Sequence, residues 1–141
     1  MKKITFFISL LCTIFVSCEL ETSRNGDIEG AWLLTKIDTL KTSGTQDMRS
    51  RSILWSVQYN LLSIREESTE FLFHFKYEND TITLLDAYNA YHEEWDRVVE
   101  DPSILAPFGV HELNERFKVA NIHSDKMILE TKDYRLKFQR Y

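Results

Sequence analysis

Four aromatic side chains recur at every second position between residues 71 and 77, and this spacing constrains the fold more than any other feature. The rings belong to Phe71, Phe73, Phe75 and Tyr77. A period of two places all four on one face of an extended strand, whereas a helix would distribute them around its axis. Because such a face has to be buried, the segment predicts a strand packed against an apolar core.

A second alternating run lies between residues 52 and 65. Its inward set is Ile53, Trp55, Val57 and Tyr59. The alternation then changes phase at Leu61-Leu62 and resumes through Ile64, as expected where a bulge bends a long strand. The two runs together predict a curved sheet.

Short polar turns divide much of the remaining chain into hairpins. The turns that we expect are Glu78-Asn79-Asp80, Ser124-Asp125 and Lys132-Asp133. The strands beside them are 71–77, 81–85, 117–122, 127–131 and 134–140. With a first strand over 31–38, the count reaches seven, or eight if the segment 52–65 is divided. So many short strands predict a mainly β protein, either a barrel or a sandwich.

One section follows a helical spacing instead. Between Ala87 and Glu100, apolar residues recur three or four positions apart, at Tyr88, Tyr91, Trp95 and Val98 or Val99. Asp101-Pro102 can then cap and begin a one-turn helix, which Pro107 ends. We therefore expect a short helical insert between strands, either a plug packed on the open end of the sheet or a lid over a cavity.

The N-terminus has the pattern of a secretory signal. Lys2 and Lys3 precede an apolar stretch over residues 4–16, which is shorter than the roughly 20 residues that a membrane span requires. Cys18 follows directly after Val16-Ser17, and this arrangement resembles the lipobox of bacterial lipoproteins. We expect residues 1–17 to be a signal peptide, residues 18–25 to be the lipidated cysteine with its polar tether, and residues 26–141 to be the folded domain.

Cysteine usage supports lipidation of Cys18. The other cysteine, Cys12, leaves with the signal, so the mature chain has a single sulfur and no partner for an internal disulfide. The several acyl chains of a bacterial lipoprotein hold a protein firmly at a bilayer, since each buried CH₂ contributes about 0.8 kcal/mol. We therefore expect the protein in the cell envelope, anchored by lipid to the outer membrane and facing the periplasm or the medium.

The charge of the chain argues against nucleic acid as a partner. The net charge is −5, and removal of the signal with its two lysines makes the mature protein more acidic still. Nucleic-acid binding requires a basic stripe, and no Lys/Arg cluster longer than a pair occurs in the sequence.

No residue cluster in the sequence indicates a reaction. The histidines, at 74, 92, 111 and 123, lack zinc-ligand spacing, and the motifs of common metal, nucleotide and hydrolase sites are missing. His92-Glu93-Glu94-Trp95-Asp96 gathers carboxylates, but adjacent residues of a helix do not face each other, so we interpret the run as a solvated face. We expect no enzymatic activity, no metal and no cofactor.

Gly30-Ala31-Trp32 begins the first expected strand, ahead of an antiparallel meander that ends with cationic residues in the last strand. This arrangement resembles the lipocalins, a calycin-type barrel family, and in particular the small lipocalin-like lipoproteins of the Bacteroides group. Three further segments look similar to that group: Leu105-Ala106-Pro107-Phe108-Gly109-Val110, Lys126-Met127-Ile128-Leu129 and the ending Leu136-Lys137-Phe138-Gln139-Arg140-Tyr141.

The resemblance implies an up-and-down β-barrel of about eight strands. It also implies that Trp32 crosses the closed end of the barrel beneath an arginine, either Arg140 or Arg135, with Gly30 beside them. A cation–π contact of this kind contributes about 0.5–2 kcal/mol.

Two functions remain open at this point. In the first, the barrel binds a small hydrophobic or amphipathic molecule among rings of the two aromatic runs, namely Trp55, Tyr59, Phe71, Phe73, Phe75 and Tyr77. In the second, a ligand-free module of an envelope assembly contacts a protein partner through an exposed apolar patch around Tyr88, Tyr91 and Trp95.

Overall fold

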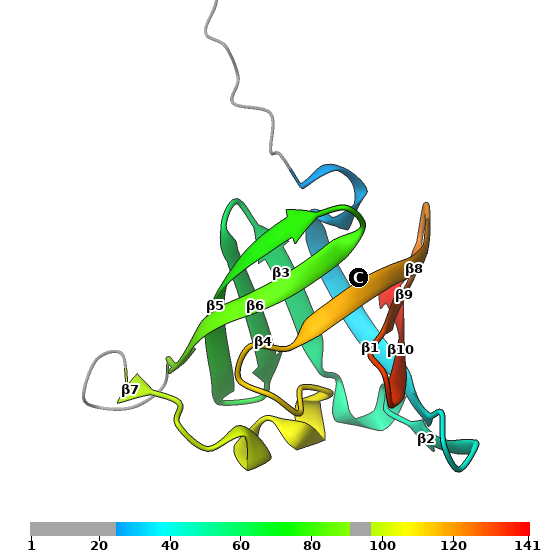
Figure 1. Ribbon diagram of the computed structural model, residues 1–141, viewed down its shortest axis with the longest axis horizontal. Coiled ribbons are helices and arrows are strands. Elements are labelled where there is room, and N and C mark those ends of the chain that lie inside the picture. The colour runs from blue at the N-terminus through cyan, green and yellow to red at the C-terminus, as the bar shows by residue number, and fades with distance from the viewer. Residues whose placement is uncertain (1–24, 91–96) are drawn as a thin grey trace, which may run out of the picture.

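The computed structural model describes residues 25–90 and 97–141. Eight antiparallel strands form a closed barrel (Figure 1), and the last strand pairs with the first to close it. In order around the barrel the strands are β1 (Gly30–Thr39), β3 (Leu54–Gln58), β4 (Leu61–Glu66), β5 (Thr69–Glu78), β6 (Thr81–Asn89), β8 (Arg116–His123), β9 (Lys126–Glu130) and β10 (Tyr134–Arg140). The predicted up-and-down β-barrel is therefore confirmed.

Two short strands lie outside this ring. β2 (Gly44–Asp47) forms a hairpin with the second half of β1, and β7 (Arg97–Val98) pairs with the end of β6. β2 is not predicted from the sequence, because all four of its residues are exposed and no alternation of apolar side chains marks it.

The three expected hairpin turns are present. Glu78 pairs with Thr81, so the β5–β6 turn consists of Asn79 and Asp80, both with the positive φ that a tight hairpin turn requires. His123 pairs with Lys126 around Ser124-Asp125, and the β9–β10 hairpin turns at residues 131–133. Local turn chemistry therefore fixed the register of these strands.

The expected bulge near Leu61 is wrong. Gln58 pairs with Leu61, so the chain reverses in a tight turn at Tyr59-Asn60, and Tyr59 takes a φ of 54°. The phase shift at Leu61-Leu62 is the point where a new strand begins its own alternation. As a consequence Tyr59 lies outside the barrel with 62% of its surface exposed, and the expectation that it faces the interior is also wrong.

The sheet is curved, but its irregularities lie elsewhere. The register shifts beside Thr35 in β1, opposite Phe73 in the β5–β6 pair, and beside Ala120 in β8. The Thr35 hydroxyl donates to the carbonyl of Lys137 at 3.0 Å, so the shift in β1 leaves this buried side chain bonded. Such bulges bend and twist strands, which a closed barrel of this size requires.

The helix expected between Ala87 and Glu100 is wrong at both of its ends, because β6 continues as a strand to Asn89 and Arg97–Val98 form the strand β7. Asp86 has a φ of 45° at the β6 bulge, so the next inward residue after Leu84 is Ala87. Tyr91 and Trp95 lie outside the described residues.

The one-turn helix expected after Asp101-Pro102 is present as a 3-10 helix, η3 (Pro102–Ile104). The Asp101 carboxylate accepts from the backbone N–H of Ser103 at 2.9 Å. Hydrogen bonding from the side chain of Ser103, together with this backbone bond, holds the pKa of Asp101 below its ordinary value. A second 3-10 helix, η4 (Ala106–Phe108), follows at once. We call residues 102–110 the plug, because Leu105, Phe108 and Val110 are buried in the core.

The core fills the barrel along its length. Its largest fully buried side chains are Trp32, Trp55, Phe73, Phe117, Ile28, Leu34, Met48, Ile53, Leu62, Ile64, Ile82 and Leu84. Every barrel strand contributes inward residues at alternate positions, which is the pattern expected of an antiparallel sheet with one solvated face.

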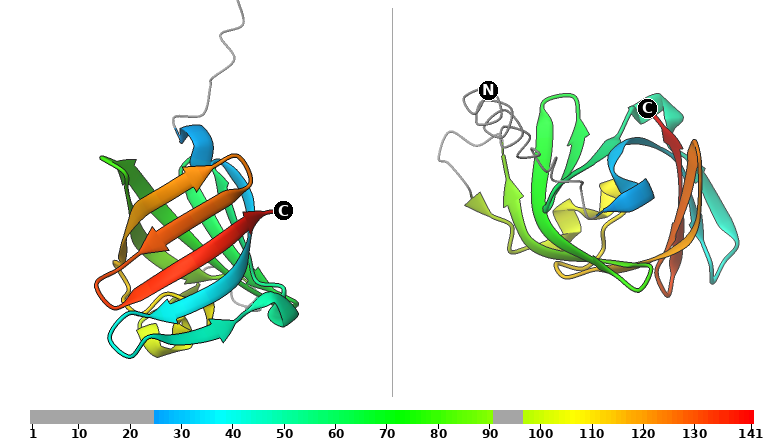
Figure 2. Two further views of the ribbon diagram at one scale, coloured as in Figure 1. Left: turned by 90° about the vertical axis from the view of Figure 1, so that its right-hand side faces the viewer. Right: turned by 90° about the horizontal axis from the view of Figure 1, so that it is seen from above.

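The two mouths of the barrel are covered differently. The 3-10 helix η1 (Gly26–Ile28) lies across one mouth, which we call the closed end (Figure 2). The opposite mouth, which we call the open end, carries the β1–β2 hairpin, the 3-10 helix η2 (Arg49–Arg51) and the plug (Figure 1).

Candidate functional site

The closed end is built on Trp32. Its ring is fully buried, and its indole N–H donates to the carbonyl of Ile28 in η1 at 2.9 Å. The guanidinium carbon of Arg140 lies 4.1 Å from the centre of the ring, so the charge stacks over the aromatic face. Arg135 instead donates to the carboxylate of Glu130 at 2.8 Å, so of the two arginines it is Arg140 that covers Trp32.

Arg140 also satisfies backbone carbonyls at this end. Its two terminal nitrogens donate to Asp27 and Glu29 at 3.1 and 3.0 Å, and its Nε donates to Ser124 at 3.0 Å. Gly30 has a φ of 117°, and a Cβ at this position would lie 2.9 Å from Arg140. Glycine therefore gives the arginine room, and the contacts make the closed end a structural seal.

The remaining aromatic candidates pack against one another. Trp55 contacts Phe117 and Phe138 in edge-to-face geometry, with ring centres 5.5 and 5.1 Å apart. No exposed fraction among Trp55, Phe71, Phe73 and Phe75 exceeds 7%. A ring without accessible surface has no water-sized space beside it. These four rings are therefore packed among neighbouring side chains, and their role in binding a ligand stays a prediction.

Tyr77 is half-buried against the core, close to the closed end. Burial raises the pKa of its hydroxyl above the ordinary value, and the carboxylates of Asp80 and Asp27 act in the same direction. Tyr77 thus remains a neutral phenol at the edge of the core.

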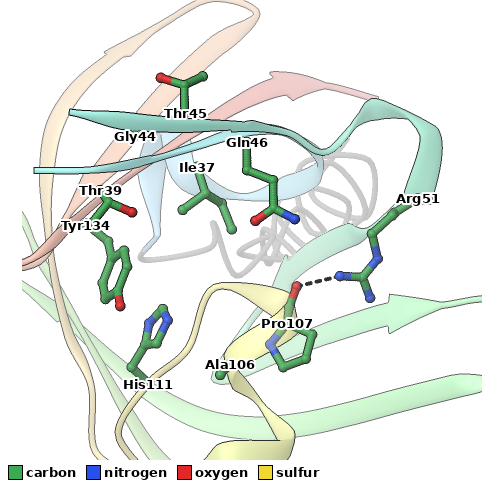
Figure 3. Close-up of a pocket in the computed structure, with 10 residues that line it drawn as sticks. All are labelled: Ile37, Thr39, Gly44, Thr45, Gln46, Arg51, Ala106, Pro107, His111 and Tyr134. Carbon is green, nitrogen blue, oxygen red and sulfur yellow. Dashed lines mark hydrogen bonds between the residues drawn. The ribbon is translucent and has the colours of Figure 1, made fainter. Parts of the chain in front are cut away.

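A pocket of about 460 Å³ lies at the open end (Figure 3). Its walls come from the β1–β2 hairpin, η2, the plug with the residue after it, and the start of β10. The lining residues are Ile37, Thr39, Gly44, Thr45, Gln46, Arg51, Ala106, Pro107, His111 and Tyr134. The volume falls in the range of roughly 300–1,000 Å³ that is usual for small-molecule sites.

His111 and Tyr134 form one wall of the pocket. Their rings are stacked, with centres 3.9 Å apart and planes within 4° of parallel. Burial lowers the pKa of His111 below its ordinary value of 6.5, against the opposing effect of the Glu115 and Asp133 carboxylates. The imidazole is therefore neutral at pH 7, and its buried Nδ1 has no hydrogen-bond partner among the described residues.

Glu115 holds the loop that carries His111. Its carboxylate is buried and accepts from the backbone N–H groups of His111 and Glu112, each at 2.7 Å. Its own backbone carbonyl accepts from Leu84 in β6 at 2.9 Å. The loop is thereby tied to the barrel wall, which fixes the position of the imidazole.

Arg51 fixes the plug from the other side of the pocket. It forms a bidentate pair with Glu66 at 2.7 and 2.5 Å, and it donates to the carbonyl of Pro107 at 2.8 Å. Its guanidinium also lies 5.5 Å from the ring centre of Phe108, which itself packs edge-to-face on Phe71. Because all three contacts are made at once, Arg51 latches the plug onto the barrel rim.

Sequence reasoning missed this pocket. Its walls come from four stretches, around residues 37–46, 51, 106–111 and 134, and no pattern within any one of them indicates that they meet. His111 was considered only as a metal ligand. The signal that was available is Tyr134, which follows the turn residue Asp133 at the start of the last strand. In a closed barrel the last strand pairs with the first, so this ring lies at the mouth of the barrel beside the end of β1.

The described residues offer little for catalysis or metal binding. Across 25–90 and 97–141, no group of three or more metal-ligating side chains is present, and no helix is long and apolar enough to span a bilayer. His74 lies 3.7 Å from Asp86 on the outer face of the barrel, and both side chains are exposed.

Comparison with known proteins agrees with this architecture. Residues 12–141 match the model of the lipocalin-like domain family. No curated protein matches the chain. A lipocalin-like protein from Bacteroides uniformis ATCC 8492 has a similar structure, with a TM-score of 0.62 and 17% identity over 82% of this chain and 100% of that one.

Two further solved structures share the fold. An uncharacterized protein from Bacteroides eggerthii DSM 20697 has a TM-score of 0.57 and 17% identity, covering 80% of this chain and 98% of its own. A protein from Burkholderia xenovorans has a TM-score of 0.55 and 11% identity, covering 80% and 82%. With its family model, its closed barrel and the arginine stacked over Trp32, this chain belongs to the lipocalin-like domain family.

Proposed function

We propose that the protein is a lipid-anchored envelope lipoprotein whose barrel binds a small amphipathic molecule in the pocket at the open end. The observation that carries this proposal is the pocket itself. It has the volume of a ligand site, whereas the interior below it is filled by the aromatic core.

The lining of the pocket defines the chemistry of the molecule. Ile37, Ala106 and Pro107 offer apolar contact. Thr39, Gln46 and the neutral His111 offer hydrogen-bonding groups (Figure 3). Arg51 already bonds to Glu66 and Pro107, so its charge is largely compensated and favours an anion only weakly. A neutral or zwitterionic molecule with one apolar part fits this lining best.

Attachment to the membrane rests on the sequence. Cys18 stands where a lipobox carries its lipid, and the described domain begins a few residues later at Asn25. We propose that the outer membrane holds the protein through this lipid, and that the mature chain acts by binding rather than by catalysis. Replacement of Cys18 by Ala is expected to move the protein from the membrane fraction to the soluble fraction; retention in the membrane would contradict the anchor.

Native mass spectrometry tests the binding function directly. The Cys18→Ala full chain, purified from cell extract without detergent, is expected to carry a co-purifying small molecule. A Gln46→Trp variant places a large ring in the pocket and should lose that mass, because Gln46 points toward Pro107 (Figure 3). Asp47→Trp is the matched control, since Asp47 neighbours Gln46 on β2, is exposed and does not line the pocket.

The outcomes separate the two candidate functions. Mass retained by Asp47→Trp and lost by Gln46→Trp supports binding at the open end. A bare mass for the unsubstituted chain contradicts it and favours the ligand-free module. Of the patch expected for such a module, only Tyr88 is described; it is half-buried and lies edge-to-face against His74.

A further inference from the structure

We propose that the closed end of the barrel is the face that seats on the lipid headgroups, so that the pocket at the open end points away from the membrane. This inference rests on the proposed lipid anchor at Cys18. It goes beyond that anchor by assigning a contact surface and an orientation to the domain.

The tether between the lipid and the barrel is short. Residues 19–24 separate Cys18 from Asn25, and seven residue steps span at most about 25 Å. Asn25 lies at the closed end, where its side-chain amide donates to the carbonyl of Tyr59 at 2.6 Å. The lipid is therefore held within about 25 Å of this end, whatever path the tether takes.

The barrel is about as tall as the stretched tether is long. A ten-residue strand such as β5 is about 33 Å long, and a tilt of about 40° leaves about 25 Å along the barrel axis. The plug and the β1–β2 hairpin extend beyond that wall (Figure 1). For the open end to touch the bilayer, the tether would have to run fully stretched along the whole barrel, whereas the closed end reaches the bilayer with slack to spare.

The rim of the closed end carries exposed apolar side chains. Tyr59 and Tyr141 are the most exposed large apolar side chains of the described residues, at 62% and 81%, and Leu61 beside Tyr59 is 42% exposed. The backbone N–H of Tyr141 donates to the carbonyl of Ala31 on one side of β1. On its other side, β1 pairs with β3, and β3 leads into Tyr59. The three side chains therefore lie on neighbouring strands, around the point where the tether arrives.

Tyrosine suits this position for a physical reason. Its ring is apolar and its hydroxyl is polar, so it is stable at the boundary between headgroups and acyl chains. The charged residues of the closed rim include Asp27, Asp80, Asp125, Lys118 and Lys126, which mix both signs. Attraction to the bilayer at this end thus comes from the aromatic rim and not from a basic patch.

The lipidated protein offers a clean labelling experiment. Cys18 is the one cysteine of the mature chain and its thiol carries the lipid, so a single introduced cysteine takes a fluorescent label alone. Tyr59→Cys and Tyr141→Cys place labels on the closed rim. Ile104→Cys in η3 is the matched control, because Ile104 is also exposed, at 44%, but lies on the plug. Since all three side chains are exposed, unchanged melting temperatures will show that the fold is kept.

The labelled proteins are reconstituted into vesicles of phosphatidylethanolamine and phosphatidylglycerol that contain a quencher attached to a lipid headgroup. Labels at 59 and 141 are expected to be quenched at least roughly threefold more than the label at 104, which stands about 25 Å further away. Equal and weak quenching at all three positions in protein that floats with the vesicles would overturn the seating alone. Strongest quenching at 104 would reverse the orientation. Protein that does not float with the vesicles would overturn the anchor as well.

Discussion

The two ends of this barrel close the same kind of opening in different ways. At the closed end, a single guanidinium bonds to three backbone carbonyls and covers a fully buried indole. At the open end, the plug, η2 and a hairpin of exposed strand residues meet around a pocket of about 460 Å³. One end is held by a single side chain that bonds to three backbone carbonyls, and the other by several side chains that bond to separate loops.

This difference indicates where a ligand pocket can form in a barrel of eight strands. Eight strands leave an interior that side chains can fill, and here the aromatic core does so. The pocket at the open end lies where loops hold the covering segments apart. In this chain those loops are held by Arg51 on one side of the pocket and Glu115 on the other.

The largest effect is expected from breaking the seal. Arg140→Met keeps an apolar stem but removes the charge over Trp32 and leaves three carbonyls without their donor. We expect unfolding in urea to show a loss of about 3 kcal/mol. Arg135→Met on the same strand removes one half-exposed ion pair and should cost less than about 1 kcal/mol. Equal losses would show that the closed end is not a seal.

The two buried tryptophans allow the closed end to be compared with the barrel interior, because Trp32 and Trp55 are direct neighbours on β1 and β3. Trp32→Phe removes the bond to Ile28, whereas Trp55 has an indole N–H with no acceptor among the described residues. Both variants lose ring volume. We expect Trp32→Phe to be the more destabilising by about 1–2 kcal/mol in urea unfolding. The reverse order would mean that the indole of Trp55 has a partner after all.

At the open end, removal of the latch should act locally. Arg51→Met is expected to cost about 1–2 kcal/mol, because it breaks the contacts to Glu66 and Pro107. Hydrogen exchange should accelerate at the amides of residues 105–110 and remain unchanged at the closed end. Arg49→Met, in the same 3-10 helix, removes only an exposed pair with Asp47 and should leave exchange in the plug unaltered. Uniform acceleration over the barrel would contradict a local latch.

The smallest effect is a pH dependence confined to the open end. The folded state lowers the pKa of His111, so its contribution to stability is present above its ordinary value of 6.5 and is lost as the pH falls below it. His111→Gln should remove this component, so that the stability difference between variant and parent shrinks from about pH 7.5 to about pH 5.5. Urea unfolding over that range measures it, and a constant difference would show that His111 does not titrate in this way.

Much of the barrel was predictable because its information is local. The period-two rings between Phe71 and Tyr77 fixed the inward face of β5, and Asn79-Asp80 fixed the register of β5 with β6. The errors are local as well. The turn at Tyr59-Asn60 and the bulge at Asp86 each shift an alternation by one residue, and a phase shift in sequence does not reveal whether the chain bends, reverses or coils.

The candidate site likewise has a part that could be predicted from local sequence and a part that could not. Gly30 and Trp32 stand in a short motif, and its resemblance to the lipocalins implied that an arginine from the last strand would cover this end. The choice of Arg140 over Arg135, and the pocket that brings His111, Tyr134 and Arg51 together, depended on strand pairings between distant segments. Periodicity and turn residues act over a few positions, so the sequence by itself determined the strands and their inward faces. Closure of the barrel and packing of its rings couple residues a hundred positions apart, and therefore only the tertiary structure decided where the interior is full and where a pocket is left.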